Sequence, residues 1–372
     1  MFEIISSQYY HLFFLIFMGV LVFFQELKLL SIDNTRLLYK ENNNNNYVPA
    51  LLLSVFLIFF FGTRDPYSVY FADTLGYAGR YDEIKEYGTK SVFYKMLIGQ
   101  SAEMIWSQII ISMAMAKIDV SVWFTLVACL YIFPILYALK KIFPNQLFLA
   151  CIFAFLNFGF YGGAINGIRN GVGLSLILLA LALFITNRNR RYIPCLLLLI
   201  AYEFHSSTIL PSLCLLGAIY IIKDAKLVVR IWISSIIISI LFGNSFILLF
   251  ESWGFDDRLY SYVNSGEANA NWGFRLDFLI FSAVPVIWGW WIINKLRYKD
   301  RAYNIIFNTY VLANSFWVLV IRASFSNRFA ALSWFLYFLV LIYPLLKKDL
   351  FPLQGQTLAI ILIGLYLINI VI

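Results

Sequence analysis

Long apolar runs, separated by short polar segments, dominate the pattern of the chain. Each run has about 15 to 23 residues, the length that a helix needs to cross a hydrocarbon core about 30 Å thick. The pattern predicts an all-α, polytopic integral membrane protein with a single transmembrane domain over residues 1–372. We expect about twelve transmembrane helices, at residues 10–27, 48–62, 120–139, 146–161, 170–187, 192–204, 206–222, 227–249, 277–294, 303–321, 329–346 and 357–372.

The composition agrees with a membrane location. Of the 372 residues, 62% are hydrophobic and only 13% are charged, a balance that cannot cover the surface of a soluble globule. The net charge of +8 is shared among many short turns instead of being gathered on one face. We therefore expect membrane lipid as a partner and no nucleic acid.

The distribution of basic residues predicts the orientation in the membrane. Cytoplasmic loops collect Lys and Arg during insertion, and six turns hold more than half of the 28 basic residues. These turns contain Lys28/Arg36/Lys40, Lys140/Lys141, Arg188/Arg190/Arg191, Lys223/Lys226/Arg230, Lys295/Arg297/Lys299/Arg301 and Lys347/Lys348. If they are cytoplasmic, the outer loops are residues 63–116 and 251–276. This assignment requires residues 93–116 to be a re-entrant or amphipathic segment on the outer side.

The predicted outer loops carry arginines, acids and tyrosines together. Arg64, Asp73 and Tyr77 lie in the loop 63–116, and Arg275 closes the loop 251–276. Guanidinium groups match phosphate oxygens, carboxylates bind hydroxyls, and aromatic faces cover sugar rings. Tyrosines near span ends are often only interfacial anchors. The combination of the three residue types indicates a site for a sugar phosphate.

Two arginines stand at the predicted outer ends of apolar helices. Arg169 opens "IRNGVGLSLILLALALF", and Arg328, shortly after Arg322, opens "FAALSWFLYFLVLIYPLL". A helix N-terminus is the positive end of the backbone dipole, so an arginine there is disfavoured unless an anion lies beside it. A snorkelling or capping arginine is the alternative interpretation. We expect both guanidinium groups to converge on one anion.

His205 lies between two apolar runs that are bounded by Arg191 and Lys223, which predicts a helical hairpin. The first arm, residues 192–204, reaches only about 20 Å at 1.5 Å per residue, so His205 is expected below the outer surface of the membrane. An ionisable group at that depth indicates a functional cavity. Histidine also titrates near neutral pH, which makes His205 the candidate for proton transfer. The alternative is a histidine that only bonds a neighbouring helix. Its neighbours Glu203 and Ser207 either orient the ring or lie too far round the turn to do so.

The order of these features resembles the EpsG-like branch of the Wzy-type O-antigen and capsule polymerases along most of the chain. Members are similar in an early outer Arg followed by an Asp and a Tyr, an outer Arg that opens a helix, an F-H-x-S turn, and a late Arg before an aromatic helix. The corresponding residues here are Arg64, Asp73, Thr74 and Tyr77, then Arg169, then Phe204 to Ser207, then Arg322 or Arg328. This chain departs from the family pattern at Asn170, where Gln is common, and at Ala72, where Gly is common.

The resemblance implies a GT-C-like architecture and a glycosyltransferase in the bacterial cytoplasmic membrane, with its active site on the outer side. It implies no cofactor and no metal. Donor and acceptor are implied to be undecaprenyl-diphosphate-linked oligosaccharides, and a polysaccharide chain-length regulator is a further candidate partner.

The residues at these positions suggest roles in the transfer. Arg169 and Arg328, supported by Arg322 or Arg64, are expected to hold the donor diphosphate. His205 is expected to deprotonate the acceptor hydroxyl, and direct attack then inverts the anomeric centre. Retention would need a nucleophilic carboxylate, for which Asp73 is the candidate. Tyr77 and Arg275 complete the substrate-binding set.

Two other classes of function stay open at this point. A flippase or transporter of the same lipid-linked sugar would need cationic residues along a path through both leaflets, whereas the unusual charges here lie on one side. An O-antigen ligase or sugar acyltransferase also uses outer arginines and a histidine, so sequence separates it poorly from a polymerase.

The predicted orientation can be tested by cysteine labelling. In a background without native cysteines, a thiol placed at Asn44 should be protected from an impermeant reagent added to intact spheroplasts, because the turn is cytoplasmic. A thiol in the loop 63–92 should react. Labelling at Asn44 would refute the orientation and, with it, the outward-facing site.

Overall fold

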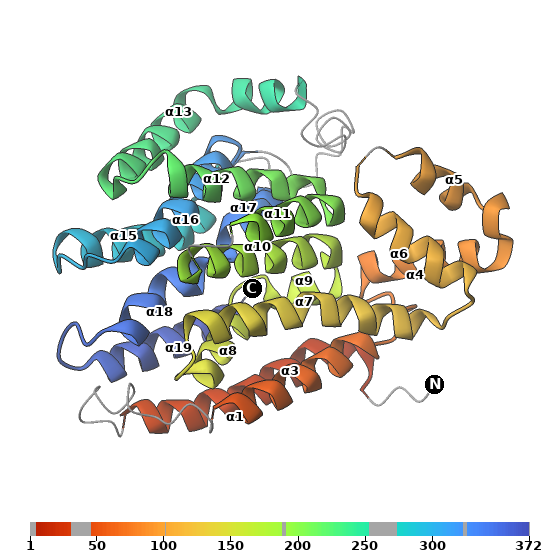
Figure 1. Ribbon diagram of the computed structural model, residues 1–372, viewed down its shortest axis with the longest axis horizontal. Helices are drawn as coiled ribbons and strands as arrows, with labels where there is room; N and C mark the ends of the chain where they lie inside the picture. Colours follow the sequence, from red (N-terminus) through yellow and green to blue (C-terminus); the bar gives the residue numbers. More distant parts are fainter. Residues whose placement is uncertain are drawn as a thin grey trace. The chain divides into compact units, whose positions relative to one another are not determined.

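The computed structural model describes residues 5–30, 46–100, 102–187, 191–252, 274–322 and 326–371, and the regular elements in these residues are all helical (Figure 1). Side chains are described for these residues except 243–252, 326 and 327. The chain divides into two compact units, Met1–Thr208 with Leu345–Ile372, and Ile209–Pro344. Most of the predicted outer loop 251–276 and Asn42 to Asn45 lie outside the described residues.

The first unit contains the candidate site. Its helices are α1 (Tyr10–Leu30), α3 (Tyr47–Gly62), α4 (Ala72–Tyr87), α5 (Val92–Gly99), α6 (Met104–Met115), α7 (Val120–Ile142), α8 (Leu147–Phe155), α9 (Phe160–Ile165), α10 (Ile168–Thr186), α11 (Tyr192–Phe204) and α19 (Gln354–Val371), with short 3₁₀ turns at Ser7–Tyr9, Gly88–Lys90 and Ser206–Thr208.

Helix α7 forms the centre of this unit. It packs against α3 on one side and α10 on the other, and α10 packs in turn against α11. The Asp119 carboxylate caps α7 by accepting a hydrogen bond from the Ser121 N–H at 2.8 Å, and Lys140 and Lys141 lie in its last turn, where the backbone dipole favours cations. The hydrophobic core lies along this row of helices.

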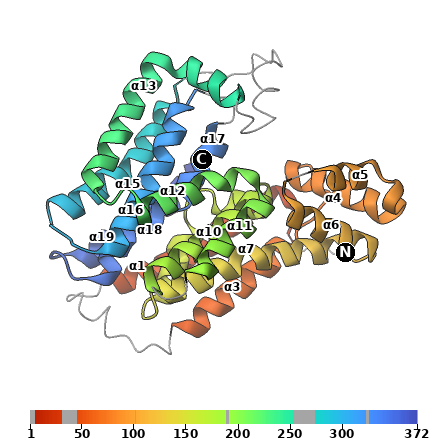
Figure 2. The same cartoon turned by 45° about the horizontal axis from the view of Figure 1, so that its top comes forward.

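Helices α4, α5 and α6 gather beyond one end of the α3–α7–α10 row (Figures 1 and 2). They pack against one another, and α6 also contacts α11. At about 1.5 Å per residue, neither α5 nor α6 is long enough to cross a membrane. The segment 93–116 is thus broken into two short helices, in agreement with a segment that does not cross, while its side of the membrane remains a prediction.

The start of α10 is held by close backbone packing. A Cβ on Gly171 would lie 2.6 Å from the carbonyl oxygen of Gly163, so only glycine lets α9 and α10 approach so closely. One turn of helix before this contact, α10 begins after the N-cap Gly167, and Arg169 is its second residue. The prediction that Arg169 opens a helix is therefore confirmed.

The second unit is arranged around α16 (Arg301–Leu319). Helices α12 (Ile209–Tyr220), α13 (Ala225–Ser252), α15 (Leu276–Asn294) and α17 (Ser326–Trp334) contact it, and α18 (Tyr337–Lys347) follows α17. One buried amide links three of these helices: Asn314 on α16 accepts from the Trp232 indole on α13 at 2.8 Å and donates to Ser333 on α17 at 3.0 Å. Without these hydrogen bonds, burying the polar groups in an apolar interior would cost free energy.

The described residues include seven helices that are long and apolar enough to cross a membrane. They overlap the predicted spans 10–27, 120–139, 170–187, 227–249, 277–294, 329–346 and 357–372. The spans 48–62, 192–204 and 206–222 correspond to shorter apolar helices, and 303–321 corresponds to α16, whose asparagines lower its hydropathy. The protein is thus an all-α, polytopic membrane protein.

Three predicted spans are interrupted. The span 146–161 is broken between α8 and α9, where Gly159 has a left-handed φ of 89° that continues neither helix. The span 227–249 has a kink at Phe242, and 329–346 is divided between α17 and α18. Hydropathy alone does not register these breaks, because the interrupted segments stay apolar throughout.

The close approach of α9 and α10 predicts the effect of a methyl group there. Gly171→Ala should destabilise the protein by about 1 to 3 kcal/mol, because the new Cβ meets the Gly163 backbone, which cannot give way as a flexible side chain would. Gly79→Ala is the matched control, since a Cβ there meets nothing within 4 Å. Thermal unfolding in detergent measures both, and an unchanged melting temperature for Gly171→Ala would contradict the packing.

Candidate active site

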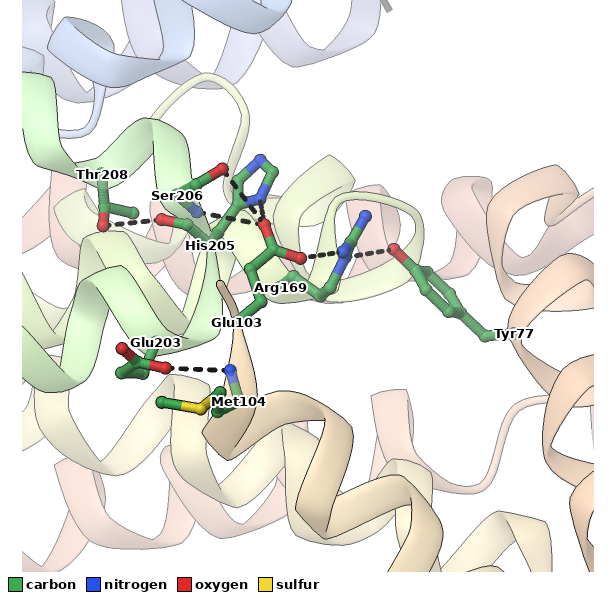
Figure 3. Close-up of polar contacts among 8 residues, drawn as sticks. All are labelled: Tyr77, Glu103, Met104, Arg169, Glu203, His205, Ser206 and Thr208. Carbon is green, nitrogen blue, oxygen red and sulfur yellow. Dashed lines mark hydrogen bonds and ion pairs between the residues drawn. The ribbon is translucent and has the colours of Figure 1, made fainter. Parts of the chain in front are cut away.

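Glu103 lies at the centre of a polar cluster in the first unit (Figure 3). It is the N-cap residue of α6 and has left-handed backbone angles, φ 61° and ψ 35°, which are uncommon for a residue other than glycine. Its side chain is only 11% exposed. Such backbone geometry is costly and recurs at functional sites, where the surrounding contacts hold it in place.

One oxygen of the Glu103 carboxylate pairs with Arg169. Oε2 accepts a hydrogen bond from Nη1 of the guanidinium, whose side chain is 15% exposed. The anion beside the start of α10 is therefore a carboxylate of the protein itself. The expectation that an anion lies beside Arg169 is met by Glu103, and the binding of a diphosphate there stays a prediction.

The other oxygen faces the turn that follows α11. Oε1 lies 2.8 Å from Nδ1 of His205, and it also accepts hydrogen bonds from the Ser206 N–H at 3.1 Å and the Ser206 hydroxyl at 3.4 Å. An ionised carboxylate only accepts, so Nδ1 carries the proton that it shares with Glu103. The remaining ring nitrogen, Nε2, points away from Glu103 (Figure 3). A neutral His205 in this arrangement presents Nε2 as a proton acceptor.

The local backbone fixes the position of His205. The residue ends α11 in an extended conformation, and its N–H bonds to the Ala201 carbonyl at 3.1 Å. Its own carbonyl accepts from the N–H and the hydroxyl of Thr208, at 3.0 and 2.8 Å. The backbone of His205 is thus held from both sides of the turn.

Tyr77 brings α4 to the same cluster. Its hydroxyl accepts a hydrogen bond from Nε of Arg169 at 3.0 Å, and its ring packs edge-on against Trp106, with ring centroids 5.7 Å apart. Asp73 lies one turn earlier on α4, at i and i+4 from Tyr77, and is exposed. Glu103 thus joins Arg169 to His205, Arg169 joins Tyr77 to them, and Asp73 stays exposed one turn away on α4.

The charge of the Glu103 carboxyl is stabilised by its partners. Burial alone would raise its pKa, but the hydrogen bond with His205, the charges of Arg169 and His205, and the backbone N–H of Ser206 together lower the pKa to about 2. Glu103 is therefore ionised across the pH range in which the protein is expected to work.

The carboxylate that orients His205 comes from α6 and not from the neighbouring residues on the chain. Glu203 instead uses Oε2 to accept a hydrogen bond from the Met104 N–H at 2.9 Å, at the start of α6. Of the two possibilities open for Glu203, orienting the ring or lying too far round the turn, this contact favours the second. Its carboxylate stabilises the helix terminus next to Glu103.

Arg64 does not join this cluster. Only 2% of the residue is exposed, and its guanidinium donates to Thr74 Oγ1, at 3.2 Å from Nε and 3.0 Å from Nη2, to the Ile165 carbonyl at 3.3 Å, and to the Phe61 carbonyl. These bonds tie the end of α3 to the start of α4 and the end of α9. Arg64 thus supports the elements that carry Tyr77 and Arg169.

Arg275, Arg322 and Arg328 belong to the second unit. Arg275 pairs with Asp277 through two hydrogen bonds of 3.0 and 2.6 Å and stacks over Phe278 at 3.7 Å. Arg322 lies 5.8 Å from the Phe274 ring, and its buried Nε meets no partner within the described part of the chain. Arg328 is exposed in the first turn of α17. Their roles in substrate binding remain predictions.

Sequence reasoning missed Glu103. Its only local signal is that it is a single acid at the start of an apolar helix, "SAEMIWSQIIISMAMAK", inside the predicted outer loop. Its partners lie 66 and 102 residues away along the chain. Only the folded arrangement of α6, α10 and α11 reveals the contact.

The helices place the protein in the class of multi-pass membrane proteins. Within this class it belongs to the EpsG family, since the family's model matches residues 49–372. Membership of this family indicates that the protein is a membrane polysaccharide polymerase of the glycosyltransferase type. Comparisons with curated proteins and with solved structures give no match.

The contacts of Arg64 predict that its substitution affects stability more than substrate binding. Arg64→Lys should lower the free energy of unfolding by about 2 to 5 kcal/mol, because lysine cannot reach three partners from one planar group. Arg80→Lys, at an exposed position of α4, is the control and should change stability by less than about 0.5 kcal/mol. A normal melting temperature with weakened donor binding in Arg64→Lys would instead favour a direct contact with substrate.

Proposed function

We propose that the protein joins undecaprenyl-diphosphate-linked oligosaccharide repeat units at the outer face of the bacterial cytoplasmic membrane. The observation that carries this proposal is the convergence of Arg169 and His205 on the Glu103 carboxylate. The Arg169 guanidinium can bind an anionic leaving group, and the His205 ring can take a proton from an acceptor hydroxyl. A polymerase that uses a lipid diphosphate donor needs both functions in one place.

Arg169 is the proposed donor-binding group. A guanidinium offers planar N–H pairs that match phosphate oxygens, and the start of α10 adds the positive end of a helix dipole. The contacts of Arg169 with other described residues use Nε and Nη1 and leave Nη2 without a protein partner in that part of the chain. A diphosphate can therefore bind without first displacing Tyr77.

His205 is the proposed general base. Nε2 takes the proton of the acceptor hydroxyl while the hydroxyl oxygen forms a bond to the anomeric carbon of the donor. The bond between that carbon and the phosphate oxygen breaks, and its electron pair leaves with the diphosphate. Arg169 stabilises the charge that accumulates on the leaving group. Direct attack of this kind inverts the anomeric centre.

Unsatisfied amide oxygens beside Arg169 support a polar ligand at this place. The side-chain oxygens of Asn166 and Asn170 are buried and have no hydrogen-bond partner among the described residues. Buried acceptors are normally satisfied, and sugar hydroxyls are suitable donors for them. We propose that these amides, with Asp73 one turn from Tyr77, contact the sugars of the substrate.

A reconstituted reaction tests the proposal. Purified full-length protein in detergent, supplied with an undecaprenyl-diphosphate-linked repeat unit, should produce a ladder of longer oligosaccharides, and EDTA should not suppress it. A single transfer product would indicate a ligase or acyltransferase instead. Transport of the lipid-linked sugar across vesicles without any new linkage would indicate a flippase.

The two proposed roles predict different kinetic defects. His205→Ala should lower kcat by about 10² to 10⁴ while the protein still retains the lipid-linked donor, because a general base contributes to turnover more than to binding. Arg169→Ala should weaken retention of the donor itself, since it removes the charged group that holds the diphosphate. Donor retention and initial rates measure both effects. A folded His205→Ala protein that polymerises normally would leave His205 with only a structural role.

A further inference from the structure

Glu103 takes up Nη1 of Arg169, one of the guanidinium nitrogens that an anionic ligand would also bind. A single carboxylate serves three partners, with Oε2 on Arg169 and Oε1 on His205 and Ser206 (Figure 3). Any anion that binds the Arg169 guanidinium must therefore share it with Glu103 or replace Glu103 there.

We propose that Glu103 is a positioning residue that couples donor binding to activation of the base: the incoming diphosphate takes the Arg169 guanidinium from Glu103, and the carboxylate then acts on His205 alone. This inference rests on the proposed function, in which Arg169 binds the diphosphate. It adds a regulatory step, because the base becomes fully active only once the donor is bound.

Charge favours this exchange. A diphosphate linked at both ends carries two negative charges and several acceptor oxygens, whereas Glu103 carries one charge that is already shared. The Arg169 and Glu103 side chains are 15% and 11% exposed, so water screens their attraction only weakly. The diphosphate is therefore expected to bind the Arg169 guanidinium more strongly than Glu103 does.

The exchange does not leave Glu103 as an isolated buried charge. A buried carboxylate that loses its only partner is strongly destabilised. Here Oε1 keeps the His205 ring at 2.8 Å and the Ser206 N–H at 3.1 Å. Glu103 can release Arg169 because these bonds remain.

The release of Arg169 increases the negative charge that the Glu103 carboxylate presents to the His205 ring. While Glu103 is paired with a guanidinium, part of its negative charge is compensated, so it supports a proton on the ring only weakly. Once the diphosphate holds Arg169, the full carboxylate charge faces Nδ1–H and stabilises the imidazolium that forms when Nε2 accepts a proton. His205 becomes a better base at the moment when the donor is in place.

The groups around His205 allow this effect to be isolated. Glu103 approaches from the start of α6, Arg169 from α10 and Tyr77, through Arg169, from α4. Glu203, on α11 with His205, is engaged with the Met104 N–H. Glu103 is therefore the carboxylate whose removal should alter the ring directly, and Glu203 provides the matched control.

The test compares Glu103→Gln with Glu203→Gln in the purified full-length protein. Glutamine keeps the size and one acceptor oxygen of glutamate but loses the charge. Inorganic pyrophosphate serves as the probe for the Arg169 site. Glu103→Gln should bind pyrophosphate about tenfold more tightly, because the competing anion is gone. Its kcat for polymer formation should fall about 10²-fold or more without a rise in the donor KM.

The pH profile supplies a readout that a purely structural role would not alter. In Glu103→Gln the acid limb of kcat should move to lower pH, because a ring without the carboxylate beside it loses its proton more readily. Glu103 itself does not titrate in this range, since its pKa is lowered to about 2 by partners that outweigh its burial. Glu203→Gln should leave pyrophosphate affinity, kcat and the pH profile unchanged.

The outcomes distinguish failure of the coupling through Glu103 from failure of the proposed donor-binding role of Arg169. If Arg169→Ala abolishes pyrophosphate binding but Glu103→Gln leaves affinity and the acid limb unchanged, the coupling is refuted and the donor-binding role of Arg169 stands. If Arg169→Ala does not weaken pyrophosphate binding, the coupling and the donor-binding role of Arg169 are both refuted. Should Glu103→Gln not fold, Glu103→Asp keeps the charge and should retain the wild-type acid limb, and a limb moved to lower pH in that variant would also refute the coupling.

Discussion

The contacts of one carboxylate organise the functional end of the first unit. Glu103 accepts hydrogen bonds from Arg169, the His205 ring and the Ser206 backbone, and so joins the starts of α6 and α10 to the end of α11. None of these helices alone would place an arginine and a histidine together. The pair forms because a buried anion requires several donors, and the surrounding helices supply them.

This constraint explains features that would otherwise be unfavourable. The left-handed backbone of Glu103 and the arginine at the positive end of α10 each cost free energy in isolation. The ion pair between Glu103 and Arg169 offsets the dipole at α10, and Gly171 lets α9 approach closely behind it. The arrangement holds an arginine and a histidine side by side, and both side chains keep part of their surface exposed.

The sequence predicts the parts of this site that depend on local physics. Helix dipoles single out Arg169, and the short first arm, Tyr192–Phe204, singles out His205. The family resemblance is confirmed, and so are seven of the predicted spans. Glu103 could not be predicted, because its role follows from contacts across 66 and 102 residues of chain. The partners of Arg64 are equally hard to foresee, since Ile165, whose carbonyl accepts from its guanidinium, lies 101 residues away along the chain.

The tautomer of His205 tests the central claim most directly. The protein has only two histidines, so a His11→Gln variant with ¹⁵N-labelled histidine reports on His205 alone in an NMR spectrum. Because a carboxylate only accepts hydrogen bonds, the neutral ring should carry its proton on Nδ1 and leave Nε2 unprotonated. A neutral ring with its proton on Nε2 would contradict the account, since the nitrogen assigned to accept the proton of the substrate would already hold one.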